Sequence, residues 1–485
     1  MANQFSIPEK GSDGEDLLQK METFKEKDLN YESGKFFGYV FFPPKDIYDV
    51  VKKAYVSYIA TNGLNPSAFP SLRKMESEVV GMTASLLNGD ENTTGTMTSG
   101  GTESIMMAVL SAREWAIHHK KIQGTPEVLA PASAHPAFPK ACHFFGLKYV
   151  EAPLNEDYRV NVAEMEKLVN ANTVLMVCSA PQYPQGVIDP VSEVAAIAQK
   201  NNILCHVDGC VGGYMLPFLE KGGVFLPPFD FRVPGVTSLS ADTHKYGYAA
   251  KGASVILYKN KELRRGQFYI KTDWTGGIYG SPSFAGTRPG GAIAAAWAVL
   301  NYVGMERYVK MQMDTYHTAE KLKTGVKAID GLKVLGNPQA TLFAIASDKY
   351  DIHAIADEMF EMGWYLNRQQ LPPSIHIFVT HIHVGKEQMF LDDLEIAVKK
   401  AHRLNWESLK KSVQVGAVRG LRKILKPQTF DKLLDKAKGS TDVNNHRQAA
   451  MYGMMGALEG SDKLEDIVMD FIDQLNSPPQ NKEEK

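Results

Sequence analysis

Short apolar runs alternate with longer stretches of helical period between residues 69 and 302. The runs at 174–178 and 203–207 predict buried strands, and the apolar spacing in 103–118 and 191–200 predicts helices. Strands joined by helices in this order form βαβ units, whose strands lie parallel in one sheet. We therefore expect an α/β domain in this part of the chain.

The pattern changes beyond Gly304. The predicted elements are an amphipathic helix at 308–326, strands at 332–334 and 341–345, a helix at 352–362, a strand at 375–380 and helices to about Leu475. This mixture indicates a smaller α+β lobe. We expect the large domain at residues 69–305 and the small C-terminal domain at residues 306–476.

The ends of the chain have a different composition. Residues 1–20 and 477–485 are charged and poor in large apolar groups, which is typical of frayed, disordered tails. The segment 1–68 also holds an aromatic cluster, formed by Phe36, Phe37, Tyr39, Phe41 and Phe42. Such an apolar segment would not remain in water, so we expect it to pack on the core or on a second subunit of a dimer.

Charge and cysteine content exclude several classes of function. The 485 residues include 53 basic and 55 acidic side chains, a net charge of −2, so a nucleic-acid partner is not expected. The four cysteines lack a CxxC pair, which favours free thiols and no metal site. The first 20 residues do not resemble a signal peptide, and no window reaches the roughly 18 apolar residues that span a bilayer. We expect a soluble, cytoplasmic protein.

The stretch 98–104, Thr-Ser-Gly-Gly-Thr-Glu-Ser, leads into a predicted helix. Its glycines and hydroxyls fall where backbone N–H groups are unpaired and the helix dipole is positive, which suits a phosphate group. It is neither a Walker loop nor GxGxxG, so nucleotide binding is disfavoured. A plain helix N-cap with Glu103 in the first turn fits the stretch equally well.

Two further side chains follow predicted strands. Asp208 comes directly after the run 203–207, at the carboxyl end of a parallel strand, where open α/β sheets bind ligands. It could hold a cationic ring nitrogen, although Asp-Gly after a strand is also an ordinary turn. His135 follows the strand-like run 128–130 and could offer a flat face to a ring, although a lone histidine there is usually structural.

Lys245 follows His244 in a hydroxyl-rich stretch at 238–247. A lysine that forms a Schiff base must be held by its backbone and surrounded by groups that lower its pKa. Taken without the other motifs, a lysine that follows a histidine is more often an ordinary solvated side chain. Together, the phosphate loop, histidine, strand-end aspartate and lysine supply what pyridoxal phosphate requires: a phosphate site, a stacking partner, a carboxylate on the pyridine nitrogen and a covalent anchor. We therefore predict this cofactor.

Longer stretches of the chain resemble the sphingosine-1-phosphate lyases, within the group II pyridoxal-phosphate decarboxylase superfamily. These are FPSLRKMESEVV at 69–80, TSGGTESIMMA at 98–108, SAHPAFPKA at 133–141, PQGVIDPV at 184–191, HVDGCVGG at 206–213, FDFRVPGVTSLSADTHKYGYAAKG at 229–252 and DWTGGIYGSPSFAGTRPGG at 273–291. The resemblance implies fold type I, with a mainly parallel seven-stranded sheet in the large domain and a smaller C-terminal α+β domain.

The resemblance also implies roles for the residues of the cofactor site. Lys245 would bind the cofactor covalently, Asp208 would contact the pyridine nitrogen and His135 would stack on the ring. The residues implied for the phosphate are Gly101, Thr102, His244 and, from the neighbouring subunit, Thr287. The chain is thus expected to form a homodimer with shared active sites.

The substrate side of the site follows the family pattern less closely. The resemblance assigns Lys251 to the substrate's phosphate and Tyr183 to the active site. Asn65 stands where the family has a histidine that binds substrate phosphate from the partner subunit, and Phe41 aligns with a tyrosine of the same task. An asparagine adds no charge and a phenylalanine donates no hydrogen bond, so the predicted phosphate site is weaker than the family's.

The expected chemistry is cleavage of a carbon–carbon bond in an amine substrate. By resemblance this is retro-aldol cleavage of a phosphorylated long-chain base, which gives a fatty aldehyde and phosphoethanolamine in sphingolipid metabolism. An amino acid decarboxylase on the same scaffold is the alternative, because the bond that breaks is the one held perpendicular to the cofactor ring. The complete set Lys245, Asp208 and His135 argues against a non-catalytic binding protein.

Overall fold

The computed structural model describes residues 6–65, 67–401 and 462–477. Its largest sheet has seven strands in the order β2-β8-β7-β6-β5-β3-β4, and only β8 runs antiparallel to its neighbours. The strands are β2 (Thr94–Thr98), β3 (Glu127–Pro131), β4 (Lys148–Ala152), β5 (Thr173–Ser179), β6 (Leu204–Asp208), β7 (Ser238–Ala241) and β8 (Ser254–Tyr258). The predicted mainly parallel seven-stranded sheet is confirmed.

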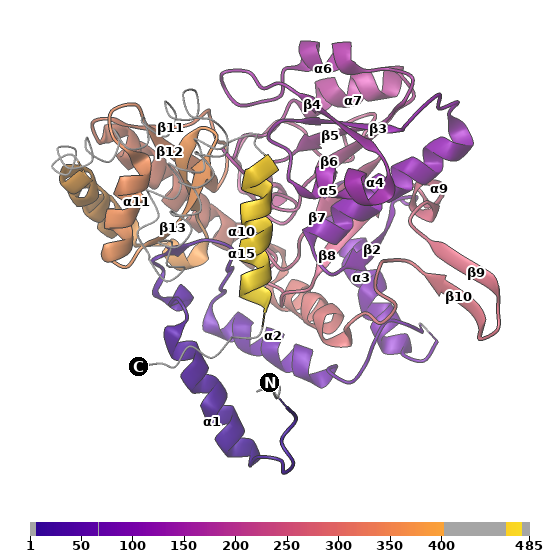
Figure 1. Cartoon of the computed structure of the whole chain (residues 1–485), viewed down its shortest axis with the longest axis horizontal. Coiled ribbons are helices and arrows are strands. Elements are labelled where there is room, and N and C mark those ends of the chain that lie inside the picture. Colours follow the sequence, from indigo (N-terminus) through magenta and orange to yellow (C-terminus); the bar gives the residue numbers. More distant parts are fainter. Residues whose placement is uncertain (1–5, 66, 402–461, 478–485) are drawn as a thin grey trace.

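Helices cover both faces of this sheet (Figure 1). They are α3 (Pro70–Leu86), α4 (Gly101–His119), α5 (Ala137–Phe145), α6 (Val162–Leu168), α7 (Val191–Lys200), α8 (Leu216–Lys221) and α9 (Lys261–Arg265). In β5, Met176 and Cys178 belong to one apolar core, and Leu175 and Val177 belong to the core on the opposite face. Because successive side chains alternate between two buried faces, the strand is a continuous apolar run.

A second sheet of five strands lies in the order β1-β13-β14-β12-β11. Its strands are β1 (Phe36–Phe37), β11 (Leu332–Val334), β12 (Leu342–Ser347), β13 (Tyr365–Gln370) and β14 (Pro373–Phe378), with α11 (Ile352–Glu361) packed against them. Within this chain, β1 pairs parallel with β13 and Phe37 is buried near Trp364. Part of the aromatic segment therefore packs on its own chain's core, the first of the two packings expected for it.

One long helix, α10 (Gly290–Ala328), connects the two sheets and bends at Gly304, where φ is 66° and ψ is 168°. A positive φ of this kind is readily adopted only by glycine, so this residue permits the change of direction. The part before the bend packs with α2 (Lys45–Ser57), and Ala319, Leu322 and Val326 beyond it enter the core of the small sheet. The predicted boundary at residues 305 and 306 follows this bend and stays a prediction.

Several elements are not expected from the pattern of apolar positions. Helix α1 (Gly14–Phe24), capped by the side chain of Asp13, replaces part of the predicted frayed N-terminus. A hairpin of β9 (Tyr269–Trp274) and β10 (Gly277–Ser281) projects from the large domain (Figure 1). Other described helical segments are residues 387–401, α15 (Asp462–Asn476) and the 3-10 turns at Lys25–Lys27, Tyr31–Ser33 and His381–His383. Residues 478–485 of the tail predicted at 477–485 lie outside the described residues.

Candidate functional site

Lys245 lies in a tight turn just after β7, and both sheets hold this turn in place. The next residue, Tyr246, is fully buried, and its hydroxyl bonds to Thr341 Oγ1 and donates to Val379 O at 2.7 Å. From α10, the hydroxyl of Tyr308 donates to Gly247 O at 2.7 Å. The backbone around the lysine is therefore fixed from two sides, as a covalent anchor for a cofactor requires.

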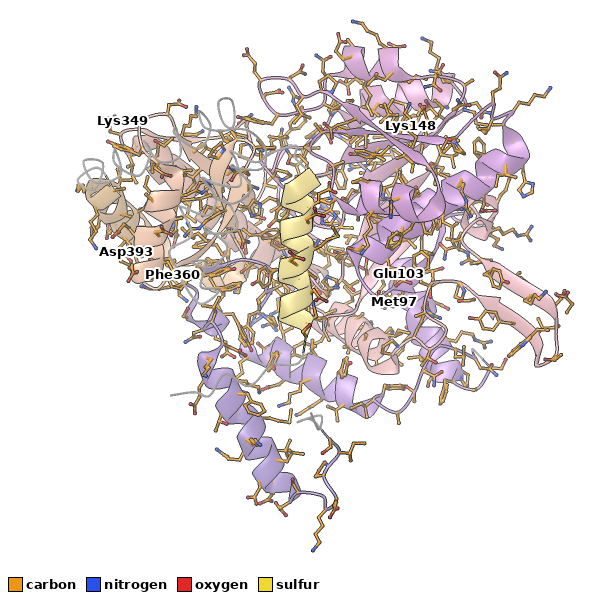
Figure 2. The ribbon with its side chains drawn as sticks, viewed as in Figure 1. Met97, Glu103, Lys148, Lys349, Phe360 and Asp393 are labelled. Carbon is orange, nitrogen blue, oxygen red and sulfur yellow. The ribbon has the colours of Figure 1, made fainter. Side chains whose placement is uncertain are left out.

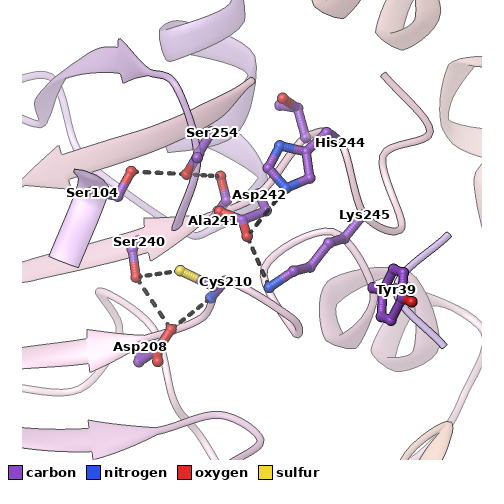
Figure 3. A network of polar contacts seen from close by, with 12 residues as sticks. Tyr39, Ser104, Asp208, Cys210, Ser240, Ala241, Asp242, His244, Lys245 and Ser254 are labelled. Atoms are coloured by element: carbon purple, nitrogen blue, oxygen red, sulfur yellow. Dashed lines mark hydrogen bonds and ion pairs between the residues drawn. The ribbon is translucent and has the colours of Figure 1, made fainter. Parts of the chain in front are cut away.

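The ammonium group of Lys245 makes an ion pair with Asp242, with Nζ 2.8 Å from Oδ2 (Figure 3). Burial alone would lower the pKa of Lys245, but the groups around it, Asp242 foremost, together outweigh burial and the pKa is raised. The expectation that surrounding groups lower the pKa of this lysine is therefore wrong. The main group that raises the pKa of Lys245 is the buried carboxylate of Asp242, three residues earlier on the same face of the turn.

The loop between β2 and α4 forms a narrow cradle beside this ion pair. A Cβ atom added to Gly101 would lie 2.8 Å from both Asp242 Oδ2 and Cys210 Sγ, so only glycine fits there. His244 lies against Gly100 on the other side. The start of α4 therefore lies directly against Asp242 and His244, and the first-turn backbone N–H groups of a helix are suited to bind a small anion.

Glu103 supports the cradle and confirms the helix-cap interpretation of its sequence. One carboxylate oxygen accepts the Ser99 N–H at 2.6 Å, and the other accepts the Phe284 N–H at 3.0 Å. Figure 2 labels Glu103 near Met97, which lies in the strand that leads to this loop. The cap and the cradle coexist, because Glu103 bonds behind the loop while the glycines face Asp242 and His244.

A row of buried hydroxyls joins the cradle to the strands behind it. Ser104 Oγ lies 2.6 Å from Thr98 Oγ1 and 2.8 Å from Ser254 Oγ, which in turn donates to Ala241 O at 3.3 Å (Figure 3). Because each buried hydroxyl has a partner, the network fixes the start of α4 against β7 and β8.

Asp208 is the last residue of β6, as its position after an apolar run predicts. Its Oδ1 accepts the Cys210 N–H at 3.0 Å and the Ser240 hydroxyl at 3.4 Å. Among the described residues, no hydrogen bond engages Oδ2. Two positions earlier, burial lowers the pKa of His206 to about 4, so this histidine is neutral and adds no charge to the site.

His135 lies in the loop after β3, with its ring turned by a hydrogen bond from the Ala137 N–H to Nδ1 at 3.1 Å. The surrounding protein lowers the pKa of His135, against the opposite effect of the Asp208 carboxylate. A neutral imidazole with a fixed orientation is suited to stack on an aromatic ring.

These side chains fit pyridoxal phosphate. The chain can pass close to Asp242 at Gly101 because this residue lacks a side chain, Asp208 Oδ2 has no hydrogen bond among the described residues, and the Lys245 ammonium lies beside Asp242. Neutral His135 completes the set. The structure brings together Gly101, His244, Lys245, Asp208 and His135 at the carboxyl ends of β3, β6 and β7, where α/β sheets bind ligands.

Lys251 lies next to this set, on the side facing the N-terminal aromatic segment. Its Nζ donates to Tyr39 O at 3.0 Å and to His244 O at 3.4 Å, and lies 5.0 Å from the centre of the Phe41 ring. The surrounding protein and the charge of Lys245 lower the pKa of Lys251 to about 8, although part of its side chain is exposed. The structure therefore brings Phe41 and Lys251 together.

Tyr183 belongs to an aromatic cluster with His376, Phe378 and Phe41. Its ring stacks on His376 with centroids 4.2 Å apart and lies 6.5 Å from Phe378, which also contacts Phe41 at 5.0 Å. The cluster forms an apolar wall between the two sheets. Tyr183 is 38% exposed, so its phenol remains accessible from solvent.

The chain is similar in sequence to proteins of one family along most of its length. Residues 3–345 match the pyridoxal-dependent decarboxylase conserved domain. The sphingosine-1-phosphate lyase 1 of Rattus norvegicus is 43% identical over 419 residues, which are 86% of this chain and 73% of that protein. The sphingosine-1-phosphate lyase of Dictyostelium discoideum is 41% identical over 81% of this chain and 74% of its own. The chain belongs to the sphingosine-1-phosphate lyase family.

Solved structures agree with this membership. The sphingosine-1-phosphate lyase of Burkholderia pseudomallei is 40% identical, with a TM-score of 0.80 over 85% of this chain and 96% of that one. A glutamate decarboxylase of Lactobacillus brevis, at 18% identity and a TM-score of 0.72, shares the fold. As a family member, the chain is a lyase that depends on pyridoxal phosphate. Within the described ranges, no helix has the length and apolar content needed to cross a membrane.

Six residues predicted for the lyase site are exposed: Asn65, Thr102, His135, Tyr183, Lys251 and Thr287. Thr102 lies in the first turn of α4, beside the cradle. Asn65 and Thr287 lie in neighbouring loops, since the Gly63 N–H donates to Arg288 O at 2.8 Å. The Asn65 side chain accepts the Ser67 N–H at 2.9 Å. No contact described in this single chain joins Asn65 or Thr287 to Lys245.

The sequence analysis missed Asp242 and gave Glu103 only a capping role. A signal for Asp242 was present, because a carboxylate three residues before a lysine lies on the same face of a helical turn. The bond from Phe284 to Glu103 had no such signal, since these residues lie 181 positions apart.

Proposed function

We propose that the protein cleaves the Cα–Cβ bond of a phosphorylated long-chain amino alcohol by a retro-aldol reaction, releasing a fatty aldehyde and phosphoethanolamine. The observation that carries this proposal is the position of Lys251. It adds a second cation beside the cofactor residues, where a decarboxylase of simple amino acids would need no phosphate ligand. Similarity to the family's named lyases supports the same reaction.

The cofactor, when bound, would withdraw electrons from the bond that breaks. Asp208 would hold its ring nitrogen in the protonated form, His135 would cover one ring face, and the cradle with Gly101, Thr102 and His244 would bind its phosphate. These roles are proposed from the contacts described above. Each places a charge or a flat surface where the cofactor requires one.

On the substrate side, Lys251 would bind the phosphate and the aromatic wall around Phe41 would exclude water. A retro-aldol cleavage removes the proton of the Cβ hydroxyl and delivers a proton to Cα. We assign these transfers to the Lys245 amine and the Tyr183 phenol. Phe41 contributes no hydrogen bond, so Lys251 carries more of the phosphate binding here than where a tyrosine is present.

We also propose that the active protein is a homodimer in which Asn65 and Thr287 of one subunit face the other subunit's site. The support is their exposure in neighbouring loops and the lack of a described contact between either of them and Lys245 of the same chain. The four free cysteines, all buried, favour a reducing compartment such as the cytoplasm.

Product analysis tests the reaction. Purified protein loaded with pyridoxal phosphate is incubated with a phosphorylated long-chain base, with the same base lacking phosphate, and separately with a panel of amino acids. We expect equal amounts of fatty aldehyde and phosphoethanolamine from the first substrate only, and neither product with Lys245→Ala. Release of carbon dioxide from an amino acid without any aldehyde would overturn the proposal in favour of a decarboxylase.

A further inference from the structure

Asp242 is the nearest anion to Lys245, and it is almost completely enclosed. Its side chain is 1% exposed, Oδ2 lies 2.8 Å from Lys245 Nζ, and His244 Nε2 lies 3.7 Å away. Within the described part of the chain, Oδ1 has no hydrogen-bond partner. The carboxylate therefore depends on Lys245 for most of its compensation.

The other titratable groups around Lys245 come from four segments, and none replaces this ion pair. They are Asp208 and Cys210 at the end of β6, His135 after β3, His244 in the same turn, and Lys251 before β8. Burial holds the pKa of His244 at about 4, and burial also raises the pKa of Cys210, so both are uncharged near neutral pH. Removing the proton from Lys245 would leave Asp242 as a buried, uncompensated anion, which is costly.

We propose that Asp242 is a positioning residue that holds the free amine of Lys245 as an ammonium ion and thereby sets the rate and pH dependence of cofactor capture. Lys245 must first give one proton to solvent. Its nitrogen then bonds to the carbonyl carbon of pyridoxal phosphate, and its two remaining hydrogens leave with the carbonyl oxygen as water. Asp242 opposes the first of these steps.

The first test needs no variant and no cofactor. Full-length protein freed of cofactor is treated briefly with a small acylating reagent at a series of pH values, and the modified lysines are identified by mass spectrometry. Only an unprotonated amine reacts, so we expect Lys251 to become reactive near pH 8 and Lys245 at a clearly higher pH. Equal reactivity of Lys245 and Lys251 near pH 8 would overturn the proposal.

The second test measures capture directly. Cofactor-free protein is mixed with saturating pyridoxal phosphate, and the limiting rate of the absorbance change is recorded from pH 6.5 to 9.5. For the wild type we expect the rate to rise about tenfold per pH unit, because an ammonium with a raised pKa yields its free amine in proportion to hydroxide. For Asp242→Asn we expect a rate at pH 7.5 at least about tenfold higher, with a rise that levels off earlier.

Two variants serve as controls. Asp242→Glu keeps the charge and is expected to restore the steep pH dependence. Asp230→Asn removes another fully buried carboxylate, which pairs with Arg232 away from the site, and should leave the profile unchanged. A profile for Asp242→Asn that coincides with the wild type would contradict the role of Asp242. Since labelling requires no cofactor, it separates this failure from a failure of the proposed lyase function.

Discussion

At the scale of single residues, the site separates two lysines by their surroundings. Lys245 has a carboxylate at 2.8 Å, and its pKa is raised. Among the described residues, the partners of Lys251 are two backbone carbonyls and an aromatic ring, and its pKa is lowered to about 8. Carbonyl dipoles offset burial less than a full negative charge does. Lys251 can therefore lose its proton within the working pH range.

This difference predicts how substrate binding depends on pH. Lys251 is a cation below pH 8 and neutral above it, so affinity for a phosphorylated substrate is present at lower pH and is lost as the pH rises through 8. We expect KM to increase above pH 8 in the wild type. Lys251→Met should raise KM about 10- to 100-fold at pH 7, the loss of a charged hydrogen bond of about 1.5–3 kcal/mol, with kcat largely kept.

Lys251→Arg is the matched control, because arginine keeps its charge throughout this range. Its KM should stay constant between pH 7 and 9. Steady-state kinetics with a phosphorylated long-chain base measure all three proteins. A wild-type KM that does not change across pH 8, or a Lys251→Met variant with unchanged KM, would remove Lys251 from the phosphate site.

At the scale of elements, we place the cofactor's phosphate at the start of α4, where Gly100 precedes the first turn and Gly101 begins it. Glu103 accepts hydrogen bonds from the Ser99 and Phe284 N–H groups and so holds the loop before α4. The bonded hydroxyls of Thr98, Ser104 and Ser254 tie the same loop to the sheet. With the loop held, Gly101 stays packed against Asp242 and Cys210.

Gly101→Ala tests this arrangement. The added Cβ would lie 2.8 Å from Asp242 Oδ2 and Cys210 Sγ, neither of which is the end of a long, flexible side chain. We expect affinity for pyridoxal phosphate to fall at least about tenfold, about 1.4 kcal/mol, in a spectroscopic titration. Gly81→Ala in α3, where no atom lies within 4 Å of the new Cβ, should bind the cofactor normally and stabilise its helix by about 1 kcal/mol. Equal cofactor affinity in both variants would contradict a tight cradle.

The same elements show what the sequence could predict. The ends of β3 and β6 were placed within one or two residues, because their apolar runs are buried on both sides, and this located His135 and Asp208. The direction of the pKa shift at Lys245 was missed, since it depends on where Asp242 points within a turn. The hairpin β9–β10 was missed because its residues are mostly exposed and follow no buried period.

At the scale of the whole molecule, one chain leaves Asn65 and Thr287 exposed, and no described contact joins either of them to Lys245. Loops 62–65 and 286–289 lie side by side, and Arg288 pairs with Glu76 behind them. In the proposed homodimer, these loops of one subunit would line the active site of the other subunit. Closed two-fold symmetry would then build two equivalent sites, each from both chains.

Mixing two inactive variants tests the shared site. Lys245→Ala lacks the covalent anchor, and Thr287→Asp places a negative charge where the partner's phosphate would bind. If each site takes Lys245 from one chain and Thr287 from the other, a mixed dimer has one intact site. After unfolding and refolding together, the mixture should recover about a quarter of wild-type lyase activity. Recovery no greater than the sum of the separate variants would place both residues in the same chain's site.

The whole site depends on Lys245 being the lysine that binds pyridoxal phosphate. The direct measurement is reduction of the loaded protein with borohydride, which makes the carbon–nitrogen link permanent, followed by peptide mapping. We predict a phosphopyridoxyl group on Lys245 and on no other lysine, and none on Lys251. A label on Lys251, or none on the peptide that contains Lys245, would contradict the account of this site.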